Sequence, residues 1–274
     1  MAVTMADIQR LRKMTGAGMM DCKNALNEAG GDFDKAIEII RKKGQAVAAK
    51  REDREAAEGC VLAATKGNFA AIVAVKCETD FVAKGEEFIG MVKAILNAAL
   101  EKQPKSTEEL NELTVDGRKV SELITDRIGI TGEKMELGAY EYISATSTVS
   151  YVHPGNKLAT VCGFNLADVD FQVAKDIAMQ IAAMNPVSVN KESVPGEIVE
   201  KEKKIAREKA MEQGKPENIL DRIAEGALTK YYKDNTLLMQ DFVKDSKMTI
   251  ADYLKKQNPE LTVTGFKRIN LNVE

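Results

Sequence analysis

The sequence predicts an α+β protein with more than one domain. Amphipathic helical segments fill residues 5–44, apolar hairpin-like runs alternate with helices from residue 59 onward, and a highly charged helical stretch occupies residues 195–235. Elements in this order are typical of a helical unit joined to antiparallel sheets that are covered by helices. The 274 residues suffice for about two domains at roughly 100–200 residues each.

The pattern over residues 5–44 predicts three short helices. Asp32 is a suitable N-cap for the third helix, and Gly44 is its expected end. A polar, Ala-rich linker of helical character is expected over residues 45–59. A bundle this small is marginal alone and usually docks on a partner or on the next domain. Apolar residues at helical spacing lie on one side of the first helix: Met5, Ile8, Leu11 and Met14.

Two hairpins are expected further along. Apolar runs flank a Lys-Gly-Asn turn at residues 66–68, and a second turn is expected at residues 153–156. An amphipathic helix follows each hairpin, so the same order of elements occurs at residues 59–102 and 147–184. A duplicated α+β unit and a chance recurrence of Gly-Asn turns explain this order equally well. The segment between these units, residues 104–134, is expected to carry polar connections and one helix.

The charged stretch at residues 195–235 predicts an antiparallel helical hairpin with little core behind it. Its apolar stripe is thin, and Gly-Lys-Pro at residues 214–216 interrupts it. Such a hairpin usually meets another copy or a partner. After it, residues 248–273 predict a short helix and a strand that rejoins the earlier sheet. The stripe consists of Ile198, Ile205, Ile219, Ile223, Ala227 and Tyr231.

Composition argues against several classes of protein. The net charge is -3, aromatic residues make up 5%, and Trp is absent, which is unlike a nucleic-acid binder. Because no run of about 18 apolar residues occurs, we expect no membrane span. The N-terminal residues lack the pattern of a signal peptide, so a cytoplasmic location is expected.

The sequence also lacks the signatures of an enzyme. No phosphate-binding loop motif and no CxxC pair occur, so neither a nucleotide site nor a zinc site is favoured. Cys77 and His153 could form a nucleophile–base pair, but Cys77 ends an apolar run and no orienting acid is identifiable. We therefore expect no catalytic residue, no metal and no cofactor. The four cysteines are Cys22, Cys60, Cys77 and Cys162.

Seven segments of the sequence indicate the function by their resemblance to a known family. Together, and in the same order, they resemble the bacterial elongation factor Ts family, the guanine-nucleotide exchange factors of the GTPase elongation factor Tu. The resemblance spans nearly the whole chain and implies a non-catalytic factor in protein biosynthesis. One departure is Asp241, where the family often has Pro. The segments are LRKMTGAGMMDCKNAL (11–26), CETDFVAK (77–84), RIG (127–129), YVHPG (151–155), IAMQIAAMNP (177–186), VEKE…AMEQGKP (199–216) and QDFVKD (240–245).

The resemblance also implies a division of the chain. Residues 1–54 would form a three-helix ubiquitin-associated-like domain and linker, and residues 55–146 the N-subdomain of the core. Residues 147–190 and 236–274 would form a related C-subdomain. An antiparallel coiled-coil hairpin, residues 191–235, would be inserted into it.

In this family a Thr-Asp-Phe turn wedges into the partner's G domain and disturbs its Mg²⁺ and GDP phosphate site. Here that turn is Thr79, Asp80 and Phe81, followed by Val82. Further contacts implied with elongation factor Tu are Arg12, Met19, Met20, Lys23, Ile128, Gly129, His153, Phe242, Val243 and Lys244.

Some of these residues have plain structural alternatives. Asp80 could be the N-cap of the helix that follows, Gly129 could end a helix, and Val243 could be strand packing. A passive adaptor that docks partners without affecting nucleotide remains open. So does assembly as a homodimer or as a 2:2 complex with elongation factor Tu.

Overall fold

The structure is a computed structural model of the chain, and it describes residues 3–272. It confirms the α+β class with antiparallel sheets. Each of the two main sheets has three strands. The first has the order β1 (Glu58–Lys66), β2 (Phe69–Cys77), β5 (Met135–Ser144). The second has the order β6 (Ser147–Val152), β7 (Leu158–Phe164), β10 (Val263–Asn270), and β10 confirms the expected return strand.

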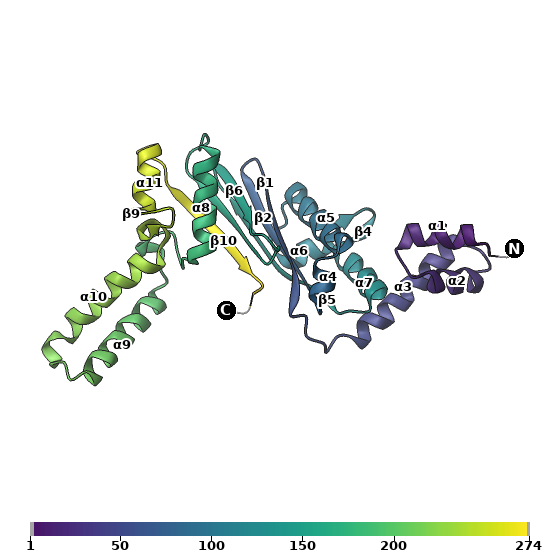
Figure 1. Ribbon diagram of the computed structural model, residues 1–274, viewed down its shortest axis with the longest axis horizontal. Coiled ribbons are helices and arrows are strands. Elements are labelled where there is room, and N and C mark those ends of the chain that lie inside the picture. Colours follow the sequence, from purple (N-terminus) through teal and green to yellow (C-terminus); the bar gives the residue numbers. More distant parts are fainter. Residues whose placement is uncertain (1–2, 273–274) are drawn as a thin grey trace.

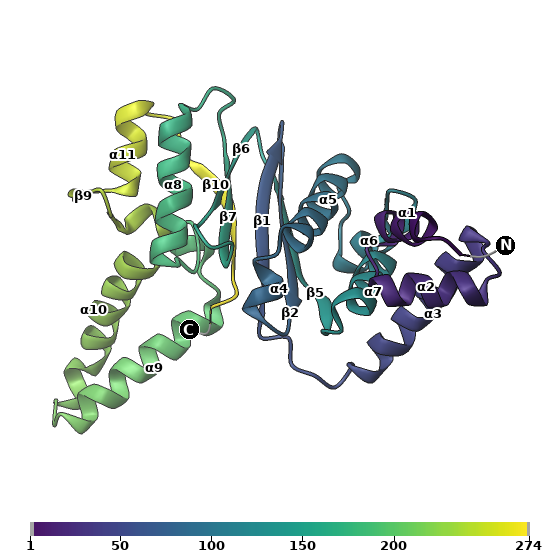
Figure 2. The ribbon, with the colours of Figure 1, turned by 45° about the vertical axis from the view of Figure 1, so that its right-hand side comes forward.

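The two sheets pack face to face, and helices cover their outer faces (Figure 2). Strand β2 is buried on both sides, which explains its near-continuous apolar sequence. Alternate residues point in opposite directions. Val73 and Val75 lie in the core under the helices, whereas Ile72 and Ala74 lie between the sheets.

The helical layers repeat the same plan. Helices α5 (Glu86–Lys102) and α7 (Val120–Thr131) pack on the first sheet, and α8 (Phe171–Met184) and α11 (Ile250–Gln257) share a core with the second. In both units a hairpin leads to a long helix and a later strand returns beside the hairpin's second strand. This common topology favours the duplicated unit over a chance recurrence of turns.

Several short elements were not expected. They are too short to leave a periodic pattern in the sequence. They are α4 (Asp80–Ala83), α6 (Thr107–Glu112), β3 (Thr114–Val115), β4 (Arg118–Lys119), the 3-10 turns η1 (Lys191–Ser193) and η2 (Leu237–Met239), β8 (Asp241–Phe242) and β9 (Asp245–Thr249).

The N-terminal unit consists of α1 (Met5–Thr15), α2 (Met19–Glu28) and α3 (Phe33–Lys50) and lies at one end of the molecule (Figure 1). Asp32 caps α3 as expected. Of the four apolar residues at helical spacing in α1, Ile8 and Leu11 are buried, whereas Met5 and Met14 are exposed, because so small a bundle buries only a narrow stripe. Gly44 does not end α3, which continues to Lys50 because its last turns pack on the first core.

Helices α9 (Gly196–Glu212) and α10 (Glu217–Asn235) form the expected antiparallel pair at the opposite end of the molecule (Figure 1). The turn between them includes Gly214, whose φ of 71° suits glycine. The side of α10 that is buried is Leu220, Ala224 and Leu228. The stripe predicted from Ile219 and Ile223 is therefore displaced by one residue. The residues that follow these positions recur every four residues as well, so spacing alone does not distinguish the two sides of the helix. In residues 3–272, no helix combines the length and apolar composition needed to cross a membrane.

Candidate functional site

The turn after β2 carries the residues singled out by the sequence. Thr79 is extended and caps the single-turn helix α4 by accepting a hydrogen bond from the Val82 N–H at 3.4 Å. The N-cap is therefore Thr79 and not Asp80, because Asp80 already has helical geometry. Asp80 instead accepts a hydrogen bond of 2.7 Å from Lys84, which holds the pKa of its carboxyl below its usual value.

The base of this turn is anchored from two directions. The N–H and hydroxyl of Thr79 both donate to the Glu133 carboxylate, at 3.1 and 2.7 Å. The neighbouring Glu78 accepts from the Lys134 N–H at 2.7 Å and from the Arg51 guanidinium at 3.3 Å. The end of α3 and the segment after α7 therefore fix the start of the turn.

Phe81 stands out from this anchored base. Its side chain is 85% exposed, whereas Ala83, two residues later, is buried. Beside it lies a shallow hollow whose wall includes Phe88, Arg127 and Thr131. A single exposed apolar residue is ordinary on a protein surface. Phe81 differs because it is a large aromatic side chain that packs in no core and projects from a turn fixed by hydrogen bonds. It therefore presents a pre-positioned apolar surface to solvent.

The predicted N-terminal contacts lie mostly on the surface. Arg12, Met20 and Lys23 are exposed, and Met19 packs partly against the small N-terminal core. Ile128 is buried in the first core, so its side chain is not free for a partner.

Gly129 lies within α7 and packs on Gly44 of α3. The alternative that Gly129 ends a helix is wrong. Helix α7 continues to Thr131 and is capped by Gly132, whose φ is 72°.

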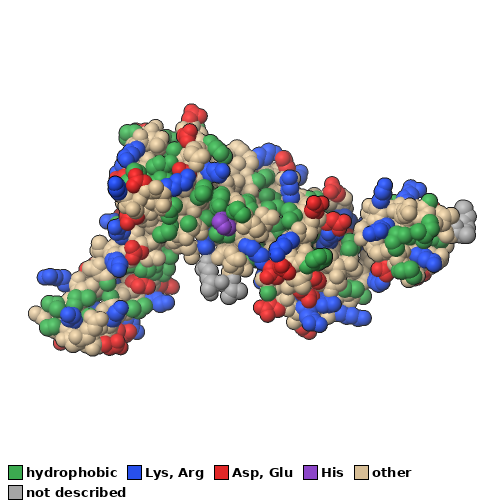
Figure 3. Space-filling view, viewed as in Figure 1, with side chains coloured by type: hydrophobic (Ala, Val, Ile, Leu, Met, Phe, Trp, Pro, Cys, Tyr) green, Lys and Arg blue, Asp and Glu red, His purple; other side chains and the backbone are tan. Residues whose placement is uncertain are grey.

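Three of the four predicted C-terminal contacts are exposed. His153 lies at the surface (purple in Figure 3), where its Nδ1 shares a hydrogen bond of 2.9 Å with the Tyr151 hydroxyl. Phe242 is buried and stacks on Tyr253 with 4.3 Å between ring centroids. Val243 and Lys244 are exposed, so Val243 does not serve as strand packing.

Comparison with known proteins gives the family. The family model described as Elongation factor TS matches residues 78–273. The chain belongs to the elongation factor Ts family. Curated proteins named Elongation factor Ts from Azobacteroides pseudotrichonymphae and Porphyromonas gingivalis are each 67% identical to it, with the whole of both chains covered. One from Amoebophilus asiaticus is 50% identical over 98% of this chain and 99% of its own.

In this member of the family, two buried residues of α8 hold the turn at residues 241–244. Gln180 donates to the Asp241 carbonyl at 3.2 Å and accepts from the Val243 N–H at 2.9 Å. Asp176 accepts from Lys244 at 2.7 Å. Asp241 lies in the short strand β8, where it pairs with Thr249 of β9. Sequence reasoning missed Asp176 and Gln180, because about sixty residues separate them from the turn and no local spacing links them.

Burial of Asp176 disfavours its charged form and by itself would raise the pKa of its carboxyl. Hydrogen bonds from Lys244, Gln172 and Tyr253 outweigh it and lower the pKa of the Asp176 carboxyl. The same burial, and the bond to the carboxylate, raise the pKa of Tyr253 to about 12. A charged carboxylate with three donors is a firm anchor for a surface turn.

The cysteines have the environment of core residues. Burial raises the pKa of the Cys77 thiol to about 12, and its sulfur donates to the Thr79 carbonyl at 3.3 Å. His153 bonds Tyr151, so each member of the considered nucleophile–base pair has another partner. Residues 3–272 contain no group of three or more His, Cys, Asp or Glu side chains placed to hold a metal ion.

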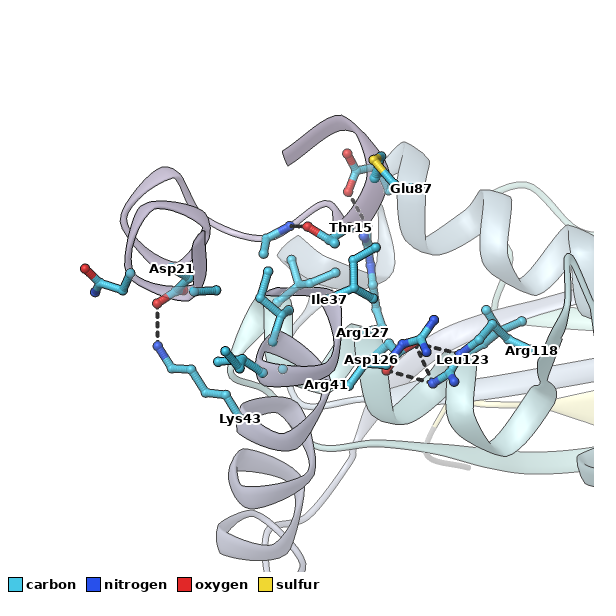
Figure 4. Close-up of a pocket in the computed structure, with 18 of the residues that line it drawn as sticks. Thr15, Asp21, Ile37, Arg41, Lys43, Glu87, Arg118, Leu123, Asp126 and Arg127 are labelled. Atoms are coloured by element: carbon cyan, nitrogen blue, oxygen red, sulfur yellow. Dashed lines mark hydrogen bonds and ion pairs between the residues drawn. The ribbon is translucent and has the colours of Figure 1, made fainter. Parts of the chain in front are cut away.

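A cavity of about 490 Å³ lies between the N-terminal unit and the core helices beside the contact of α3 with α7 (Figure 4). Its wall combines apolar residues, Met14, Ile40 and Ile130 among them, with charged residues, several of which form ion pairs. Glu87 pairs with Arg127 at 2.6 Å. The N-terminal unit is therefore joined to the core by an interface that is only partly packed.

Proposed function

We propose that this protein is a guanine-nucleotide exchange factor for elongation factor Tu during translation elongation in the cytoplasm. It acts without a catalytic site, nucleotide site or cofactor of its own. Phe81 enters an apolar slot between helices of the partner's G domain, with Thr79, Asp80 and Val82 around it. The insertion disturbs the Mg²⁺ and phosphate site and releases GDP.

One observation carries this proposal: Phe81 is 85% exposed on a turn whose base is bonded to Glu133 and whose neighbour is bonded to Arg51. Burying the exposed part of such a ring removes about 170 Å² of apolar surface from water, which is worth at most ~4 kcal/mol. Because the turn is pre-organised, little of that free energy is lost in ordering it on binding.

Linkage explains how such a contact promotes exchange. A factor that binds the nucleotide-free partner more tightly than the GDP-bound partner must weaken GDP binding by the same factor. Mg²⁺ requires near-ideal octahedral geometry, so a small displacement of its ligands weakens its binding strongly. GTP then refills the empty site and displaces the factor.

Two further surfaces complete the proposed contact. Arg12, Met20 and Lys23, with Met19 beneath them, face the G domain from the N-terminal unit. Ile128 and Gly129 are not proposed as direct contacts, because Ile128 is buried in the first core and Gly129 packs on Gly44. Val243, Lys244 and His153 face the partner's C-terminal domain, and Phe242 is buried in the core below the turn at residues 241–244.

We also propose the family's domain division for this chain. Residues 1–54 form a ubiquitin-associated-like domain and linker, residues 55–146 the N-subdomain, and residues 147–190 with 236–274 the C-subdomain. Residues 191–235 form an inserted coiled coil. The small buried cluster around Leu11 and Leu26 and the pairing of α9 with α10 support this division. Light scattering of the complex distinguishes a 1:1 from a 2:2 assembly.

The test is the release of fluorescent GDP from bacterial elongation factor Tu, followed by stopped flow. Wild type should accelerate release, and Phe81→Ala should weaken the complex by about 2–4 kcal/mol, or roughly 30- to 800-fold. Phe171→Ala is the matched control, because Phe171 is also 71% exposed but lies at the start of α8. Unchanged release with wild type, despite complex formation, would instead select a passive adaptor.

A further inference from the structure

Helices α3 and α7 cross at two glycines. Gly44 is buried in the interior of α3, and Gly129 faces it from α7. A Cβ added to Gly129 would lie 2.5 Å from the Gly44 Cα, closer than real Cβ contacts allow. A Cβ added to Gly44 would lie 3.5 Å from the Gly129 Cα, which is an ordinary contact. The two backbones therefore touch, and the contact is tight from one side only.

Glycine is unfavourable inside a helix by about 1 kcal/mol relative to alanine. Neither glycine has the positive φ that would explain its presence, and neither ends its helix. The close approach of the two helices is the remaining physical reason for Gly129, whose added Cβ would overlap Gly44. It matters because the cavity beside the crossing leaves the rest of this interface incompletely packed.

Both crossing helices lead to the Phe81 turn. Helix α3 contributes its first half to the N-terminal core and its last turns to the first sheet's core, and Arg51 at its end bonds Glu78. Helix α7 leads to Glu133, which holds Thr79. A change in the crossing distance would therefore move the N-terminal unit relative to a turn that stays anchored.

We propose that the Gly44–Gly129 crossing is a positioning contact that fixes the N-terminal helical unit relative to the Phe81 turn, so that both engage one partner surface together. This inference rests on the proposed exchange function. It gives Gly129 an intramolecular role in place of direct contact with the partner. The predicted consequence of a wider crossing is weaker engagement of the partner, while the wedge itself remains able to act.

The first measurement needs no partner. Spin labels at Asn27→Cys in α2 and Asn97→Cys in α5 report the distance between the unit and the core, because both positions are exposed and the four native cysteines are buried. Gly129→Ala should shift or broaden the distance distribution. Gly44→Ala should not, although it adds the same methyl group at the same crossing. Gly90→Ala in α5, with nothing within 4 Å of its added Cβ, is the second control.

The second measurement separates positioning from simple destabilisation. In the GDP-release assay, Gly129→Ala should raise the half-saturating concentration roughly 3- to 30-fold, the range for mutations that alter coupling between distant sites. The maximal rate should stay within about twofold of wild type, since the anchored Phe81 turn is intact. Gly44→Ala should match wild type in both parameters.

An unchanged distance distribution in Gly129→Ala overturns the inference, and so does a changed distribution with unchanged exchange parameters. If Gly129→Ala does not fold, Gly44→Val replaces it, because it adds bulk from α3 and leaves α7 intact. If wild type fails to accelerate GDP release, the proposed function fails. The distance measurement still decides whether the crossing holds the unit in place.

Discussion

Replacing Glu133 tests how the Phe81 turn is held. This carboxylate accepts hydrogen bonds from the Thr79 N–H at 3.1 Å and from the Thr79 hydroxyl at 2.7 Å. A hydrogen bond to a charged group contributes about 1.5–3 kcal/mol when it is buried. Thr79 and Glu133 are both partly exposed to solvent, so each bond contributes less here. We therefore expect Glu133→Ala to remove about 1–2 kcal/mol in total from the local stability of the turn.

The loss should be local. Amide hydrogen exchange over residues 78–83 should quicken about 5- to 30-fold in Glu133→Ala, because opening of the turn becomes easier by that free energy. The global free energy of unfolding should change much less, since the two sheets and their helices are untouched. Glu133→Gln, which keeps an acceptor oxygen but loses the charge, should fall between Glu133→Ala and wild type.

Glu136→Ala is the control for this experiment. Glu136 lies three residues further on and pairs only weakly with Lys76 and Lys134, at 3.9 and 3.5 Å. Its removal should leave exchange over residues 78–83 unchanged. Equal protection of the turn in Glu133→Ala and wild type would refute the view that Glu133 anchors it.

Three further predictions concern other parts of the chain. Asp176→Asn should be less stable than wild type at neutral pH by about 1–2 kcal/mol. Because the folded-state pKa of Asp176 is depressed, this difference should shrink as the pH falls below about 4, and a constant gap in acid denaturation would contradict it. Cys77 should resist iodoacetamide in the native protein, since burial keeps it a thiol; ready labelling would reopen a nucleophilic role. Phe88→Ala should lower the free energy of unfolding by about 3–5 kcal/mol, because the ring is fully buried, and urea denaturation measures it.

The main elements of this fold follow from local patterns in the sequence. The hairpin turn at residues 66–68, the N-cap at Asp32 and the break at residues 214–216 are each encoded within a few residues, and the structure has them where expected. The apolar runs of β1 and β2 fixed strand type in the same way. Local patterning therefore identified most elements longer than about eight residues.

The errors arose where tertiary contacts override a local signal. Gly44 has the sequence pattern of a helix end, but packing of α3 on α7 and on the first core extends the helix beyond it. Periodicity could not separate the row at Ile219 from the row at Leu220, because both have the same spacing. Asp80 and Thr79 are both good N-caps, and only the backbone geometry distinguishes them.

The candidate site shows the same limit. The motif around Phe81 was recognisable from the sequence as a family feature, and the resemblance implied an exposed ring, although no local spacing indicated one. Its anchors are far away in the chain: Glu133 is 54 residues from Thr79, and Arg51 is 27 residues from Glu78. No spacing rule connects such pairs, so only the folded chain reveals them.

The central claim is that burial of Phe81 is coupled to loss of GDP. The most direct measurement is a pair of dissociation constants, for nucleotide-free and for GDP-bound elongation factor Tu, obtained by calorimetry with wild type and with Phe81→Ala. We predict that wild type strongly prefers the nucleotide-free form and that Phe81→Ala loses most of that preference. A preference that survives intact in Phe81→Ala would contradict the account, because the wedge would then contribute nothing to nucleotide release.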